Sequence, residues 1–68
     1  MDTQQSIELV SVLLTPKELA ERWDCTVGHL ANMRSAGVGP TYLKLGATIR
    51  YRVSDLLDYE EIHTVSLA

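Results

Sequence analysis

The chain has 68 residues and a formal net charge of −3, and a chain of this length forms one small domain. It has one cysteine, so an intramolecular disulfide is impossible. A structural zinc site needs a full tetrahedral set of ligands, and the sequence offers only Cys25, His29 and His63. No apolar run approaches the roughly 20 residues of a membrane span. We therefore expect no metal, no cofactor and no membrane segment. Because the first residues have no basic signal region, we expect a cytoplasmic protein.

The N-terminal stretch reads as a tail over residues 1–12. Residues 7–14 are apolar apart from Glu8 and Ser11. This stretch predicts a short strand at residues 13–14 that leads into the first helix. The alternative is that its extra apolar residues cover the core or contact another protomer.

A first helix is predicted from Pro16 to about Trp23. Thr15 is a good N-cap, Pro16 suits the first helical position, and Glu18 completes a capping box. The expected inward stripe consists of Leu19, Ala20 and Trp23.

A second helix follows after a tight turn at Asp24 and Cys25, so the pair reads as a helix-turn-helix. Thr26 is the expected N-cap and Gly37 the left-handed residue at the end. The expected buried face consists of Leu30 and Met33, extended by Val27 and Ala36. The opposite face is small or polar and contains no acid: it carries Gly28, His29, Ala31, Asn32 and Ser35.

The pattern then changes to the alternation of strands. Residues 41–45 and 49–52 predict a two-stranded β-hairpin with its turn around Gly46. Leu43, Leu45, Ile49 and Tyr51 are expected to face the helices, and Lys44, Arg50 and Arg52 to point the other way.

A third helix is predicted over residues 54–61. Asp55 near its start complements the helix dipole. Leu56 and Tyr59 are expected to pack inward, with Leu57 as a further candidate, and the outer face is acidic. The folded domain is thus expected over residues 13–61, with a C-terminal tail over 62–68. The fold class is small α+β, with three short helices and the hairpin.

Charge is unevenly distributed along the chain. Four of the six basic residues lie between residues 34 and 52, and that interval contains no Asp or Glu. Because attraction to phosphates is local, this basic interval outweighs the acidic total and favours contact with nucleic acid.

The order of these segments resembles the small excisionase and MerR-like winged helix-turn-helix domains, which include AlpA-type regulators. The resemblance lies first in the two predicted helices, at residues 13–20 and 34–37. It continues in the Gly-Pro-x-Tyr-x-Lys-x-Gly run at residues 39–46, and then in Arg50-Tyr51-Arg52 and Ser54-Asp55-Leu56. It implies that the second helix enters a major groove of double-stranded DNA and that the hairpin forms a wing on the backbone or minor groove. It also implies binding to tandem sites, self-association on DNA and DNA bending.

The resemblance places the DNA contacts on two elements. They are Thr26, Val27, Gly28, His29, Ala31, Asn32 and Ser35 on the helix, and Lys44, Thr48, Arg50 and Arg52 on the hairpin. Asn32 is the first choice for base reading, because an amide pairs bidentately with adenine, and His29 is the second. Thr26 and Ser35 suit phosphates. Arg52 has an alternative role as the ion-pair partner of Asp55 or a neighbouring acid.

Three functions are consistent with this sequence. The first is a DNA-bending accessory protein of the excisionase type, which promotes integrase-mediated excision of a phage or mobile element. The second is a small AlpA- or MerR-like transcriptional regulator that uses the same surface. The third is a protein-interaction module without DNA binding. We expect no enzyme, because the sequence contains no motif that pairs a nucleophile with a base. Gly28 and Ala47 stand where related domains often carry longer side chains, so we expect weak binding by one protomer and cooperative assembly on tandem sites.

Overall fold

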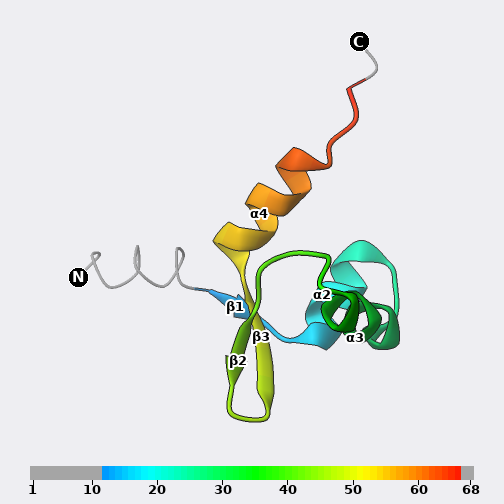
Figure 1. Ribbon diagram of the computed structural model, residues 1–68. Coiled ribbons are helices and arrows are strands. Elements are labelled where there is room, and N and C mark those ends of the chain that lie inside the picture. The colour runs from blue at the N-terminus through cyan, green and yellow to red at the C-terminus, as the bar shows by residue number, and fades with distance from the viewer. Residues whose placement is uncertain (1–11, 67–68) are drawn as a thin grey trace, which may run out of the picture.

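The computed structural model describes residues 12–66, which form a small α+β domain with three helices and a three-stranded antiparallel sheet (Figure 1). The elements in chain order are β1 (Leu13–Leu14), α2 (Pro16–Trp23), α3 (Val27–Ala36), β2 (Leu43–Leu45), β3 (Thr48–Arg52) and α4 (Val53–Ile62). The predicted contact of the apolar residues before Val12 with the core or another protomer lies outside the described residues. None of the described helices is long and apolar enough to cross a membrane.

Local capping defines α2 and α3 as the sequence predicts. The Thr15 hydroxyl accepts a hydrogen bond from the Glu18 backbone N–H at 3.1 Å, and the Glu18 carboxylate accepts one from the Thr15 N–H at 2.8 Å. The Thr26 hydroxyl accepts a hydrogen bond from the backbone N–H of His29 at 3.0 Å. Gly37 ends α3 with φ +74°, a left-handed conformation that glycine adopts at little cost.

The core is small and draws on both helices of the pair, the sheet and α4. Its buried members are Leu19, Ala20, Leu30, Tyr51 and Leu56, and Trp23 and Met33 pack against them. They confirm the predicted inward positions of Leu19, Ala20, Trp23, Leu30, Met33 and Leu56. Leu57, the further candidate of α4, is 52% exposed and does not pack inward.

The predicted burial of the two ends of α3 is wrong. Val27 is 50% exposed and Ala36 is also exposed, and Leu30 is the one buried residue of the helix. The reason is that α3 touches the rest of the described domain along a narrow strip around Leu30. The helix therefore leaves most of its surface to solvent.

The predicted orientation of the hairpin is wrong for β2. Leu43 pairs with Arg50, Lys44 with Ile49, and Leu45 with Thr48. Side chains of directly paired residues lie on the same face of a sheet. Leu43 and Leu45 therefore share a face with Arg50 and Thr48, whereas Lys44 shares the face of Ile49 and Tyr51.

The turn length is the physical reason for this difference. Two residues, Gly46 and Ala47, join the paired positions Leu45 and Thr48. Gly46 has φ +66°, which suits the first central position of a two-residue hairpin turn. The prediction assumed a three-residue turn, and a shift of one residue moves a whole strand's side chains to the opposite face.

The sheet also has one strand more than the predicted two-stranded hairpin. β1 pairs with β3 through Leu13 opposite Arg52 and Leu14 opposite Tyr51. The predicted short strand at residues 13–14 is thus confirmed, and it joins the hairpin as an edge strand because β3 has a free edge on the side away from β2.

α4 follows the end of β3 without a loop (Figure 1). It begins one residue earlier and ends one residue later than predicted. Its second half reaches α2, where the ring centroids of Trp23 and Tyr59 lie 5.7 Å apart in a stacked arrangement. α4 is therefore held at both its root and its second half.

Candidate nucleic-acid interface

The outward surface of α3 is built from small and polar side chains. With 3.6 residues per turn, Gly28, Asn32 and Ser35 lie on the side opposite the buried Leu30. All three are exposed, and so are Thr26, Val27 and Ala31. The helix contains no acidic residue, so this side presents no carboxylate that would repel a phosphate.

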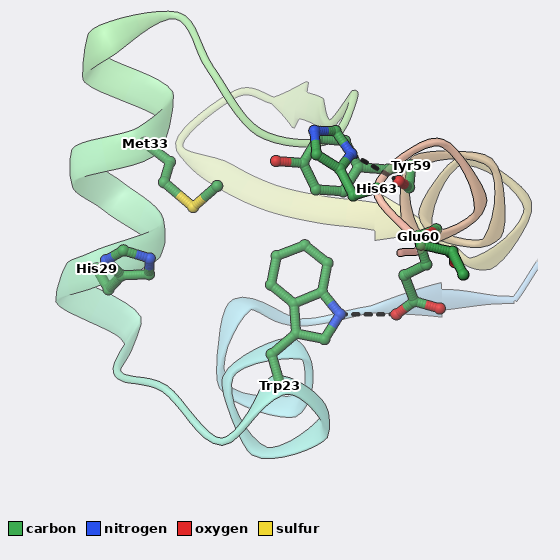
Figure 2. A pocket seen from close by; sticks show the side chains of 7 residues that line it. Trp23, His29, Met33, Tyr59, Glu60 and His63 are labelled. Carbon is green, nitrogen blue, oxygen red and sulfur yellow. Dashed lines mark hydrogen bonds between the residues drawn. The ribbon is translucent and has the colours of Figure 1, made fainter. Parts of the chain in front are cut away.

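His29 occupies a flank of α3 and not the centre of this outward side. It lies on the same side of the helix as Met33, and the two side chains line a pocket that also contains Trp23 (Figure 2). His29 thus stands at the edge of the outward side, three residues before Asn32, and stays an exposed candidate contact. Asn32 is the amide that stands on the outward side.

The opposite flank of α3 carries Arg34, which connects the helix to the sheet. Its Nη1 donates a 2.6 Å hydrogen bond to the Tyr51 hydroxyl, and its guanidinium lies 5.7 Å from the centroid of the Tyr42 ring. By sequence, Arg34 belongs to the basic interval and to the segment at the end of the second helix, and no contact with the sheet was expected. Its position four residues after Leu30 is the signal that could have placed it beside the core.

The basic residues of the hairpin lie on two faces of the sheet. Lys44 is exposed and, by register, stands on the face of Ile49 and Tyr51. Arg50 and Thr48 stand on the other face; Arg50 is partly buried and donates from Nη1 to the Ile49 carbonyl oxygen at 2.7 Å. The hairpin thus presents positive charge on both sides.

Arg52 takes the alternative role considered for it. Its Nη1 lies 3.3 Å from Asp55 Oδ2, which makes an ion pair between the end of β3 and the first turn of α4. Both side chains are partly exposed, so this pair leaves Arg52 accessible. The carboxylate nevertheless cancels much of its charge.

The acids of the described residues lie outside α3 and the hairpin, and Asp55 contacts the hairpin through Arg52. They lie on α2, on the turn after it and on α4: Glu18, Glu21, Asp24, Asp55, Asp58, Glu60 and Glu61. Among residues 12–66, α3 and the hairpin strands carry basic residues and no acidic ones. The fold therefore keeps the charge separation that the sequence shows.

The strongest ion pair links α2 to α4. Arg22 Nε and Nη2 each donate a 2.8 Å hydrogen bond to the Glu60 carboxylate, and Trp23 Nε1 donates another at 2.7 Å. The hydrogen bonds from Arg22, followed by that from Trp23, lower the pKa of Glu60 to about 2. The same Glu60 carboxylate raises the pKa of Arg22.

Within residues 12–66, no three His, Cys, Asp or Glu side chains gather closely enough to hold a metal ion. Cys25 is a free, partly buried thiol in the turn between α2 and α3. The described domain thus offers an exposed polar helix and a basic hairpin as its candidate interface.

Comparison with known proteins adds no family assignment. No family model, curated protein or solved structure matches the chain. The resemblance to excisionases and MerR-like domains stays a prediction, and the functional argument depends on the surface described above.

Proposed function

We propose that this protein binds double-stranded DNA as a winged helix-turn-helix domain, with α3 as the recognition helix and the β2–β3 hairpin as the wing. The single observation that carries the proposal is the exposed surface of α3 and the hairpin. None of the residues of α3 and the hairpin strands is acidic, although the chain as a whole carries nine acids, and Asp55 of α4 reaches this surface only at Arg52. Within it we propose an accessory factor of the excisionase type, which bends DNA and promotes integrase-mediated excision without catalysing a reaction itself.

The outward side of α3 suits close approach to base edges. Gly28 and Ser35 are small, and they flank Asn32 on the side opposite the core. A major groove about 12 Å wide admits a helix, and an asparagine amide can pair bidentately with adenine. Because the centre of this side carries one amide, we expect a single protomer to recognise only a few base pairs.

The hairpin would supply the sequence-independent part of the binding. Lys44 is exposed, and in the described residues it has no hydrogen bond or ion pair. Arg50 adds charge on the other face of the sheet. A hairpin with cations on both faces suits a wing that lies between two phosphate strands, where each contact releases counterions.

Cooperation between protomers completes the proposal. One base-reading amide and a few cations limit the affinity of a single domain, so we propose self-association on tandem sites and contact with an integrase. A small transcriptional regulator would use the same DNA surface. The genes beside the coding sequence separate these roles, because an adjacent integrase gene is expected for an excisionase and not for a regulator.

Binding can be tested by fluorescence anisotropy on two kinds of duplex, one of random sequence and one selected from a random pool by the protein. We expect Lys44→Gln to weaken binding to both duplexes and to reduce the slope of log K against log salt by about one. We expect Asn32→Ala to weaken binding to the selected duplex by about 1–3 kcal/mol and to leave the random duplex almost unaffected.

Lys17→Gln is the matched control, because it removes the same charge from the exposed surface of α2. If Lys17→Gln reduces the salt slope as much as Lys44→Gln, the binding is diffuse and the assigned surface is wrong. If the wild-type protein binds neither duplex at low salt, the third function, a protein-interaction module, replaces DNA binding.

A further inference from the structure

A pocket of about 320 Å³ lies where α2, α3 and α4 meet (Figure 2). It is separate from the outward side of α3. Its walls come from Trp23 of α2, His29 and Met33 of α3, and Tyr59, Glu60 and His63 at the end of α4, with Thr64 beside them. The DNA-binding proposal assigns no role to this space.

The α2–α4 wall of the pocket is held rigidly. The indole N–H of Trp23 donates to Glu60, which is itself bound by Arg22 through two hydrogen bonds. The Trp23 and Tyr59 rings stack, and the centroids of Tyr59 and His63 are 4.1 Å apart. Trp23 thus packs on Tyr59 and Tyr59 on His63, so that three neighbouring rings form one aromatic wall.

The α3 wall of the pocket consists of the flexible Met33 side chain and the polar His29 ring. Met33 supplies a flexible thioether, a group that packs favourably against aromatic rings. It fits in this place because Gly39 has no side chain: a Cβ there would lie 3.0 Å from Met33 Cε. The His29 ring stands one turn before Met33 and faces the same space (Figure 2).

The polar groups of the pocket wall include one charged side chain, and it already has partners. The one carboxylate in the wall, Glu60, already accepts hydrogen bonds on both oxygens from Arg22 and Trp23. His63 uses Nδ1 to hydrogen-bond to the Tyr59 carbonyl oxygen at 2.9 Å, which leaves Nε2 for a ligand. Imidazole nitrogens and aromatic faces together suit a flat, uncharged ring that carries hydrogen-bonding atoms.

We propose that this pocket binds a small, uncharged aromatic heterocycle of one or two fused rings. The pocket is shallow and open to solvent, and its volume is at the lower end of the range for ligand sites, which starts at about 300 Å³. Ligand sites typically combine apolar walls with a few polar groups, as this pocket does. The ligand stacks against the aromatic wall and hydrogen-bonds to His29 and His63.

Trp23 is the only tryptophan in the chain, so its fluorescence reports directly on the pocket. We would titrate the full chain with adenine as the probe, and with cyclohexanecarboxamide as an uncharged ring that is not aromatic. We expect saturable quenching of Trp23 and a shift of the Met33 methyl signal in NMR spectra with adenine alone. Quenching that rises linearly, as it does for free N-acetyltryptophanamide, or equal binding of both probes would overturn the proposal.

Variants test the location of the site. His29→Ala and His63→Ala change exposed residues, and each should weaken adenine binding about two- to tenfold if a ring contact is lost. Ile62→Ala is the matched control, since Ile62 precedes His63, is 77% exposed and does not line the pocket. Circular dichroism spectra check that each variant is folded. Equal weakening by Ile62→Ala, or no effect of either histidine variant, contradicts the assigned pocket, and neither result depends on DNA binding.

Discussion

Arg34 shows how one residue can set the geometry of the candidate interface. It is the basic residue of α3, and its hydrogen bond to the buried Tyr51 hydroxyl ties the helix to the central strand of the sheet. Because β3 forms half of the hairpin, this contact fixes the angle between the proposed recognition helix and the proposed wing. Part of the positive charge in the basic interval is therefore used to orient the surface.

We predict that Tyr51→Phe destabilises the domain by about 1–3 kcal/mol, because it removes the acceptor of a charged donor in a partly buried site. Urea denaturation followed by circular dichroism measures this loss. Tyr42→Phe is the control: Tyr42 is 38% exposed, and in the described residues its hydroxyl makes no hydrogen bond. Its effect should stay within about 0.5 kcal/mol, and an equal loss in both variants would argue against a specific role for the Tyr51 hydroxyl.

At the scale of elements, α4 is attached to α2 by the Glu60 carboxylate and by the stacking of Tyr59 on Trp23. Glu60 accepts hydrogen bonds from Arg22 and Trp23, residues that lie 38 and 37 positions earlier in the chain. The root of α4 is anchored separately by the buried Leu56. Loss of the Glu60 contacts should therefore loosen the second half of α4 before the rest of the domain unfolds.

The lowered pKa of Glu60 predicts the pH dependence of this attachment. In the folded state its pKa is about 2 and its ordinary value is 4.5, so the ionised form stabilises the fold above pH 4.5. This contribution is lost as the pH falls from about 4.5 towards 2. We expect Glu60→Gln to be less stable than the wild type at pH 7, with a difference that shrinks across this range.

Thermal unfolding at a series of pH values measures the effect of Glu60→Gln. Glu61→Gln is the matched control, because Glu61 is its exposed neighbour and its side chain makes no ion pair within residues 12–66. It should unfold as the wild type does throughout. A Glu60→Gln difference that is constant between pH 7 and pH 2 would show that the ion pair is not its cause.

At the scale of the whole molecule, the hydrophobic core is small and contains five buried residues. These residues draw on two helices, the central strand and α4. A chain of this size is expected to have a folding stability of roughly 3–10 kcal/mol. Removal of one large core side chain is therefore expected to lower the free energy of unfolding by a large part of this value.

Adjacent leucines of α4 provide a test of this small core. Leu56 is fully buried and Leu57 is 52% exposed. We expect Leu56→Ala to cost about 2–5 kcal/mol and to leave a large part of the protein unfolded at 37 °C, because it removes packing from a core with few alternatives. Leu57→Ala should cost less than about 1 kcal/mol. Similar losses, measured by urea denaturation, would show that Leu57 is buried in an assembly.

The sequence by itself determined the features that depend on neighbours within about four residues. Thr15, Glu18, Thr26 and Gly37 define the helix ends through local hydrogen bonds and backbone preference, so the bounds of α2 and α3 could be predicted. The charge separation is likewise a property of residue order, and the fold retains it. The exposed candidate contacts of α3, with Asn32 at their centre, follow from helical periodicity.

Only the tertiary structure decided the features that depend on distant partners. β1 found its partner in β3, more than thirty residues later. His29 faces a pocket that exists because α4 folds back to Trp23. These arrangements follow from packing and strand register, and both are set by contacts between residues that lie far apart in the sequence.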